Sequence, residues 1–247
     1  MFLLKGWPFR IAGAVVLLII LAGAGWWFFV RSDNELATTA PEIPEEVKAS
    51  STPAAGASPS SSPGLAAGVR RYAIIPEQSE AAYFADEKLA NLPLPSTAKG
   101  TTKAIEGHFY LGANGLDTSQ ESKFTVDLTT LRSDQSRRDN QVQQRGLETA
   151  KYPKATFVAT KLEGYPSEFP AGQEVEMKLT GTLDLHGVKK EVTWDVKMKK
   201  EGEALSALAT VNFLYADFNI PVLNIAGMVS VEDDVTLQVQ VVAKASG

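Results

Sequence analysis

Few side chains in this sequence have the chemistry of a catalytic or metal site. Its two histidines are His108 and His186, and it has no cysteine. His108 lies in a segment typical of a strand, and His186 lies in a tight turn, where histidine tolerates a positive φ better than most residues. No carboxylate or third imidazole stands at ligand spacing from either histidine, so we expect no metal site. We interpret both as structural residues and assign no catalytic residue.

The other polar groups offer equally little for catalysis. The sequence has no G-x-S-x-G motif, which would mark the nucleophile of an α/β-hydrolase. Arg137, Arg138 and Asp139 form a cluster that can bind an anionic head group, but the first turn of a solvated helix explains it as well. A net charge of −5 without a basic run argues against nucleic acid as a partner. The informative residues are therefore the apolar ones.

Residues 173–199 form the clearest predicted element, a β-hairpin. Apolar and polar residues alternate in both arms, which is typical of half-buried strands. A turn centred on His186 and Gly187 sets Leu179 opposite Trp194 and brings the two apolar faces together. The same register also opposes pairs of opposite charge, each contributing about 0.2–1 kcal/mol. These pairs are Asp184 with Lys189, Lys178 with Asp195, Glu176 with Lys197, and Glu174 with Lys199.

The segments around this hairpin follow the same pattern. The stretch between Asp134 and Arg145 predicts the one helix, with Ser133 or Asp134 as its cap and Gly146 at its end. Eight or nine antiparallel strands with one short helix favour an all-β fold, a closed or nearly closed β-barrel. A two-sheet sandwich is the alternative. Besides the hairpin, strands are predicted at 70–75, 81–86, 102–111, 123–128, 155–162, 205–213 and 235–243.

The N-terminal region differs in composition from the rest of the chain. Residues 11–30 carry no charge and are long enough to cross a hydrocarbon core of about 30 Å as a helix. Lys5 and Arg10 precede this run, which by the positive-inside rule keeps the N-terminus in the cytoplasm and the rest of the chain outside. We therefore predict a single-pass anchor in the cell membrane at 1–31. A signal peptide cleaved near 22–24 is the alternative.

A second composition boundary follows the predicted anchor. Residues 32–69 are rich in Pro, Ser, Ala and Thr and show no apolar periodicity. Such a segment cannot bury enough apolar surface to order itself, so we predict an unstructured linker. The linker would join the anchor to an extracytoplasmic domain at 70–245.

Several segments of this domain resemble the YceI-like family, in the same order and at similar spacing. They read YAIIPEQSEAAYF at 72–84, RRDN at 137–140 followed by KYPKATF at 151–157, LTGTLDLHGVKKEVTW at 179–194, and ADFNIP at 216–221. The resemblance covers about residues 70–245. It implies a lipocalin-like, eight-stranded antiparallel barrel of exported proteins that hold a polyisoprenoid or similar amphiphile in a central tunnel.

The sequence departs from the family pattern near its late motif. Tyr215 stands where the family usually has Arg, two residues before its Asp-Phe-Gly, and Asn219 replaces the Gly. The segment before the KYP at 151–153 also lacks the FF pair that many members carry. These differences affect the residues that would surround a ligand head group.

We expect a binding protein rather than an enzyme. An elongated apolar ligand would be held by burial, at about 25 cal/mol per Å², with one or two polar groups fixing its head. Its partners would be this lipid and, through the N-terminal helix, the membrane, with no cofactor beyond a bound isoprenoid or other long-chain lipid. Alternation along the strands predicts the tunnel lining as Phe84, Phe109, Phe124, Phe157, Leu179, Trp194, Val211, Phe213 and Phe218.

Two other functions remain open from the sequence. The first is an extracytoplasmic interaction module with a solid core and no ligand. The second is hydrolysis that uses His108 or His186. The sequence does not identify the ligand or its chain length. It also does not show whether the ligand is transported, stored or sensed, or which oligomeric state the protein has.

Overall fold

The computed structural model describes residues 34–49, 65–89, 96–170, 172–225 and 229–246. The membrane helix predicted at 11–30 lies outside these residues. Within the described residues, no helix has both the length and the apolar character needed to cross a membrane.

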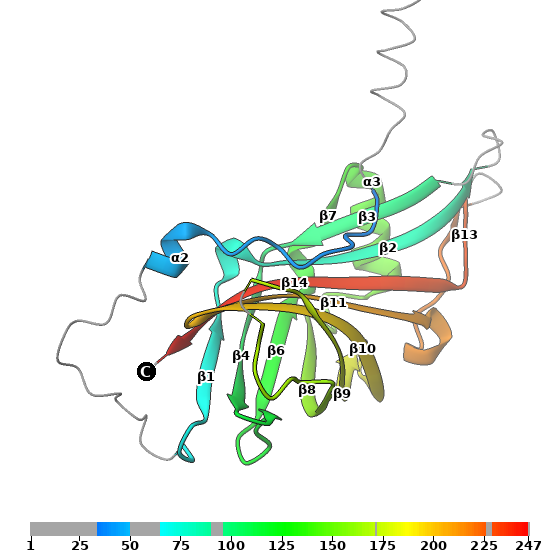
Figure 1. The fold of residues 1–247 in the computed structure, drawn as a ribbon. Helices are drawn as coiled ribbons and strands as arrows, with labels where there is room; N and C mark the ends of the chain where they lie inside the picture. Colours follow the sequence, from blue (N-terminus) through cyan, green and yellow to red (C-terminus); the bar gives the residue numbers. More distant parts are fainter. Residues whose placement is uncertain (1–33, 50–64, 90–95, 171, 226–228, 247) are drawn as a thin grey trace, which may run out of the picture. The chain divides into compact units, whose positions relative to one another are not determined.

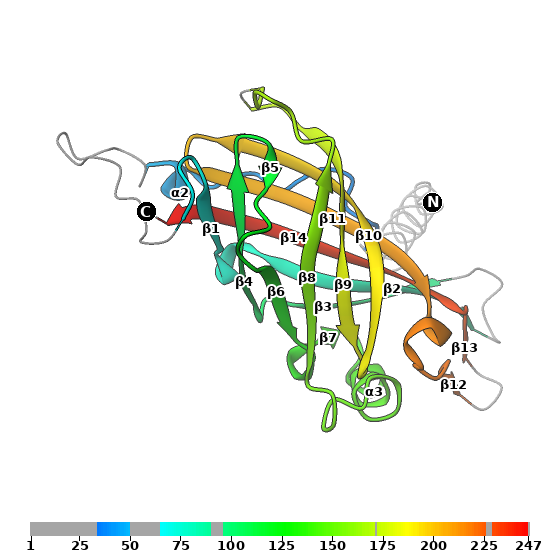
Figure 2. The ribbon, with the colours of Figure 1, turned by 90° about the horizontal axis from the view of Figure 1, so that it is seen from below.

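Eight antiparallel strands close into a barrel (Figures 1 and 2). The last strand pairs with the first, from Arg71 opposite Ser246 to Ile74 opposite Ala243, so the ring of hydrogen bonds is complete. The predicted barrel is therefore confirmed, and the sandwich alternative is wrong. In order around the ring the strands are β1 (Arg70–Ile74), β4 (Ile105–Gly112), β6 (Ser122–Asp127), β8 (Lys154–Glu163), β9 (Val175–Leu185), β10 (Val188–Glu201), β11 (Ala204–Leu214) and β14 (Asp234–Ser246).

Three further strands extend the sheet beyond β14. They are β2 (Glu80–Leu89), which pairs with β14, β3 (Ser96–Thr102), which pairs with β2, and β7 (Arg132–Ser133), which pairs with β3. The 3-10 turn η1 (Pro76–Gln78) separates β1 from β2, because Pro76 has no N–H for a strand ladder. The remaining short strands are β5 (Gly115–Leu116), β12 (Asn224–Ile225) and β13 (Val229–Val231).

The sequence pattern missed β3 because its inward positions are small. Gly100 lies directly opposite Tyr83 of β2. A Cβ on Gly100 would meet the Tyr83 ring at 2.3 Å, so only glycine leaves room for this ring. Because small residues of β3 pack beneath the large Tyr83 ring, this strand lacks the apolar alternation that identifies a strand in sequence.

The central hairpin has the predicted register. Leu179 lies opposite Trp194, and the hydroxyl oxygens of Thr180 and Thr193 are 2.9 Å apart. Three of the four predicted charge pairs form, Lys178–Asp195, Lys189–Asp184 at 3.8 Å and Lys197–Glu176 at 3.7 Å.

The fourth predicted pair, Glu174 with Lys199, is wrong, because both residues contact a segment that precedes the barrel in the sequence. Glu174 accepts a hydrogen bond from the Ala40 N–H at 2.8 Å, and Lys199 pairs with Glu42 at 3.3 Å. We name residues 36–49 the strap. It ends in the short helix α2 (Glu45–Ala49) and belongs to the same compact unit as the barrel.

The strap runs over the outer face of β11 and its two neighbours. Ala37 exchanges two hydrogen bonds of 2.9 Å with the side chain of Gln238 on β14, and the Thr38 carbonyl accepts one from Lys197 on β10. Ala40 and Ile43 are buried. The structure thus differs from the predicted linker over this part of 32–69, while residues 50–64 lie outside the described residues.

An outward apolar strip on β11 and β14 is buried. Leu208 and Val242 point away from the barrel interior, because their strand neighbours Ala207 and Val241 belong to the interior cluster, yet both are buried. Covering such a strip removes apolar surface from water and so favours an ordered strap.

Candidate functional site

Three aromatic rings meet in the barrel interior. Phe124 of β6 lies directly opposite Phe157 of β8, and their ring centroids are 5.4 Å apart. The Trp194 ring of β10 meets both edge to face, at 6.1 Å from Phe124 and 5.8 Å from Phe157. Gly181 of β9 leaves space for this cluster, since a Cβ there would meet the Phe157 ring at 2.6 Å. Such aromatic pairs add about 0.5–1.5 kcal/mol to simple burial.

Most of the predicted lining residues come together in this interior. Phe109 is half-buried and packs against the others, with its ring 6.3 Å from that of Phe124. Their contact with a ligand stays a prediction. Seven are buried members of one apolar cluster, Phe124, Phe157, Leu179, Trp194, Val211, Phe213 and Phe218.

Phe84 is the predicted lining residue that the structure places elsewhere. Ala81 belongs to the interior cluster and Tyr83 packs against it, so alternation along β2 turns Phe84 to the outer face. Phe84 is buried there, with the Lys99 ammonium nitrogen 5.6 Å from its ring centroid. The parity of this strand was ambiguous in sequence because two large aromatic residues are adjacent. We therefore remove Phe84 from the candidate lining.

Polar and charged residues gather at one end of the barrel, which we name the α3 end. It contains the helix α3 (Ser136–Gln141), the π-helical turn η3 (Val142–Gly146), the 3-10 turn η4 (Tyr215–Phe218) and the β9–β10 turn. Figure 2 shows α3 beside one end of β8, β9 and β10. The predicted helix is confirmed. Its N-cap is Gln135, whose side chain makes no capping hydrogen bond, so the prediction of Ser133 or Asp134 as the N-cap is wrong.

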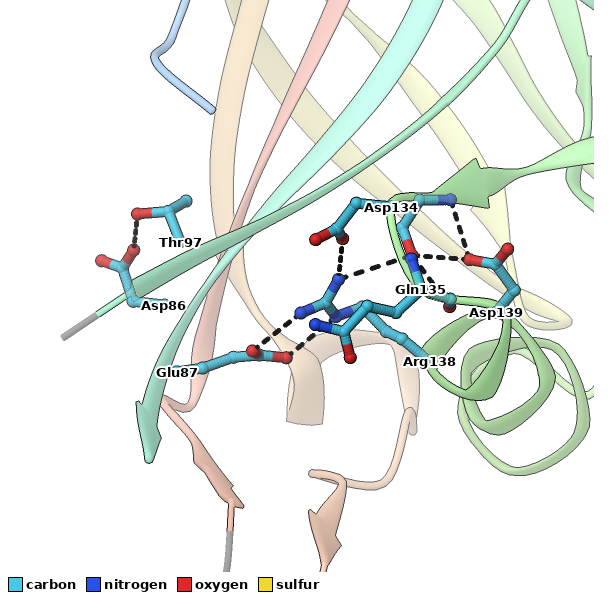
Figure 3. A network of polar contacts seen from close by, with 8 residues as sticks. Asp86, Glu87, Thr97, Asp134, Gln135, Arg138 and Asp139 are labelled. Carbon is cyan, nitrogen blue, oxygen red and sulfur yellow. Dashed lines mark hydrogen bonds and ion pairs between the residues drawn. The ribbon is translucent and has the colours of Figure 1, made fainter. Parts of the chain in front are cut away.

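The Arg138 side chain is fully engaged at this end. It donates to both carboxylate oxygens of Glu87 on β2, at 3.2 and 3.1 Å, and pairs with Asp134 (Figure 3). The Asp139 carboxylate accepts hydrogen bonds from the Ser133 N–H at 2.8 Å and its hydroxyl at 2.7 Å. These partners are carboxylates and a hydroxyl of the chain itself. The arrangement gives Arg138 a structural role in place of an anion-binding one.

Two tyrosines lie near this network. Burial raises the pKa of Tyr83 to about 12, and burial also raises the pKa of Tyr215 above its ordinary value. Both phenols are therefore neutral at physiological pH. Tyr215 and Tyr83 pack against the interior cluster, so they form the boundary between the apolar interior and the charged end.

His186 ties the β9–β10 turn to the other parts of the α3 end. Its Nδ1 is 3.1 Å from the Phe218 carbonyl oxygen, and its Nε2 is 3.0 Å from the Glu148 carboxylate. The Tyr152 ring packs against the imidazole at 4.6 Å, and φ of His186 is 53°. This geometry agrees with the structural interpretation and with the expected positive φ.

The other histidine, His108, packs against a neighbouring ring. The His108 ring packs edge to face on Tyr110 at 5.3 Å. Burial and the nearby Arg71 charge lower the pKa of His108. In the part of the chain that the structure describes, no group of three or more His, Cys, Asp or Glu residues could hold a metal ion.

Two features of the site could not be read from the sequence. The Arg138–Glu87 pair joins residues 51 apart in the chain, and no local pattern links them. The second feature is the backbone conformation of Asn219, which adopts φ 54° at the end of η4, where the family pattern has Gly. Asparagine tolerates this left-handed conformation better than most other residues, so the substitution preserves the turn.

Comparison with known proteins agrees with this fold. A family model described as YceI-like domain matches residues 72–243. A UPF0312 protein of Vibrio parahaemolyticus is 28% identical over 144 residues, which cover 56% of this chain and 72% of that protein. Protein YceI of Escherichia coli O157:H7 is 30% identical over 105 residues, which cover 42% of this chain and 50% of that protein.

Solved structures share the architecture. Burkholderia cenocepacia BcnA superposes with a TM-score of 0.52 at 20% identity, covering 69% of this chain and 99% of that one. A polyisoprenoid binding domain from Saccharophagus degradans superposes with a TM-score of 0.54 at 16% identity, covering 71% of this chain and 98% of that one. At these identities the likeness shows the fold alone. Because the family model spans nearly all of the barrel and most of the sequence, the chain belongs to the YceI-like family.

Proposed function

We propose that this protein binds a long apolar amphiphile, a polyisoprenoid or a similar lipid, inside its barrel. The observation that carries the proposal is the interior, where every strand of the barrel contributes apolar side chains. Leu179, Val211 and Phe213 each keep 8% of their surface accessible although they belong to this interior cluster. An eight-stranded barrel is just wide enough either to be filled by side chains or to hold one small ligand.

The comparisons support this class of ligand. The chain belongs to the YceI-like family, and one structural neighbour is described as a polyisoprenoid binding domain. Burial of apolar surface contributes about 25 cal/mol per Å², so an elongated hydrocarbon chain needs few polar contacts to bind. No bond has to break for the protein to carry, store or sequester such a molecule.

A membrane location completes the proposal. The charge-free run at 11–30 is long enough to anchor the chain, and the preceding Lys5 and Arg10 would keep the N-terminus in the cytoplasm. The barrel would then be extracytoplasmic, where it could exchange a lipid with the membrane surface.

Native mass spectrometry of the purified full chain tests the binding function. We expect one lipid to accompany each chain, and solvent extraction should identify a long-chain isoprenoid or similar amphiphile. A chain that is purified empty and also takes up no added long-chain isoprenoid would contradict the proposal.

A solid-cored interaction module is the second candidate function. The observation in its favour is the close contact of Phe124, Phe157 and Trp194, with Phe157 0% and Trp194 1% exposed. This function predicts that interior substitutions change stability alone. Ligand uptake by the native chain distinguishes the two candidates.

A further inference from the structure

The Trp194 indole presents an unpaired donor to the interior. Among the described residues, two buried side-chain polar atoms have no hydrogen-bond partner, Trp194 Nε1 and Ser206 Oγ. Ser206 belongs to the outer face, since its strand neighbours Leu205 and Ala207 belong to the interior cluster. Trp194 belongs to the interior cluster. A buried indole N–H usually finds an acceptor, because leaving it unpaired away from water is unfavourable.

The neighbours of Trp194 supply no such acceptor. The rings in contact with it are those of Phe124 and Phe157, and the residue opposite it on β9 is Leu179. A buried water molecule needs two to four polar partners, and these side chains offer none. An acceptor oxygen on a molecule bound in the interior would satisfy this donor.

The surroundings also define the charge of that acceptor. Among the described residues, the side chains in ring contact with Trp194 or opposite it on β9 carry no charge. Lys200, on the same face of β10, lies six residues further along the strand, with its ammonium nitrogen 5.7 Å from the Tyr72 ring centroid. Arg138 is held at the α3 end by Glu87 and Asp134. A phosphate or carboxylate beside Trp194 would be buried without a counter-ion, which is strongly unfavourable. A neutral oxygen carries no such cost.

We infer that Trp194 Nε1 donates a hydrogen bond to a neutral oxygen of the bound amphiphile, such as a carbonyl, ether or hydroxyl oxygen. The inference rests on the proposed function and narrows its ligand class. The polar group of the ligand lies deep in the barrel beside Trp194. Isoprenoids with a neutral oxygen are then preferred over pure hydrocarbons and over diphosphates.

Matched ligands test this preference on the full chain in detergent. The probes are squalene, a polyprenyl ketone of similar carbon number, and a polyprenyl diphosphate. We expect the ketone to bind about 2- to 10-fold more tightly than squalene, the effect of one net hydrogen bond, and the diphosphate to bind most weakly. Trp194→Phe should remove the difference between ketone and squalene. The control Phe213→Leu should weaken both and keep their ratio.

The indole proton gives a second readout, which does not depend on affinities. The chain has four tryptophans, so its ¹⁵N–¹H spectrum has four indole signals, and Trp194→Phe assigns one of them. The ketone should shift the Trp194 signal downfield, whereas squalene should not. If Trp194→Phe does not fold, replacing Trp7, Trp26 and Trp27 with Phe leaves a single indole signal, that of Trp194, and its response to the ketone decides the question.

The outcomes separate the two proposals. Equal affinity for ketone and squalene without an indole shift, or a preference for the diphosphate, overturns the inference and leaves the binding function standing. Failure of all three probes to bind overturns the binding function, and the inference with it.

Discussion

The barrel interior and the α3 end are built from opposite chemistry. In the interior, Phe124, Phe157 and Trp194 meet through their rings. At the α3 end, Arg138 pairs with Glu87 through directed hydrogen bonds. The interior is therefore suited to an apolar molecule, and the α3 end is suited to holding helix and turns in place. The two regions should respond differently to substitution.

The largest effect is expected in the interior. Phe157→Ala should lower the free energy of unfolding by about 3–5 kcal/mol, because it removes a fully buried ring and leaves a cavity. Denaturant unfolding of the full chain measures this value. Phe109→Ala is the matched control, and its loss should be smaller because Phe109 is half-buried. A loss below about 1 kcal/mol for Phe157→Ala would show that this ring is not part of a packed core.

The next effect is expected at the α3 end. Arg138→Met should lower the free energy of unfolding by about 2–3 kcal/mol, because it leaves the Glu87 carboxylate buried without a partner. The double variant Arg138→Met with Glu87→Gln should recover much of the loss. A double variant that is less stable than Arg138→Met would contradict a role based on charge compensation.

A smaller effect is expected at the β9–β10 turn. His186→Ala should cost about 1–2 kcal/mol, because it removes both ring contacts and leaves an alanine at φ 53°. His186→Asn should cost less, since asparagine accepts this backbone conformation. Thermal unfolding of the two variants compares them directly. Equal stability of His186→Ala and the native chain would rule out the structural role.

The smallest effect is expected on the outer face, where the strap is attached. Gln238→Ala should cost about 1 kcal/mol, because it removes the two hydrogen bonds to Ala37. Hydrogen exchange of the strap amides should become faster while exchange in the barrel strands stays unchanged. Gln240→Ala on the same strand is the control. Uniform faster exchange throughout the barrel would show that the strap and barrel unfold together.

Periodic patterns predicted the barrel, the hairpin register and the inward position of most aromatic residues. These features depend on neighbours along one strand or across one turn, as with Leu179 opposite Trp194. Two misses depend on distant contacts. The strap is held by hydrogen bonds to residues far away in the chain, such as Gln238, and β3 is recognisable only once Tyr83 is placed above Gly100.

The candidate site was predictable to a similar extent. Alternation placed Phe124, Phe157 and Trp194 inside, but it failed for Phe84, where adjacent aromatic residues compete for the inward face. The pairing of Arg138 with Glu87 could not be predicted, because charge pairs between distant elements leave no periodic signal. The unpaired Trp194 N–H likewise emerges only from three-dimensional packing.

The central claim, that a lipid occupies the barrel interior, is tested most directly by fluorescence quenching of Trp194. Replacing Trp7, Trp26 and Trp27 with Phe leaves Trp194 as the only tryptophan in the full chain. Titration with a brominated long-chain isoprenoid alcohol should quench this fluorescence and saturate at about one ligand per chain. Binding of the lipid without quenching, or no binding at all, would contradict the claim.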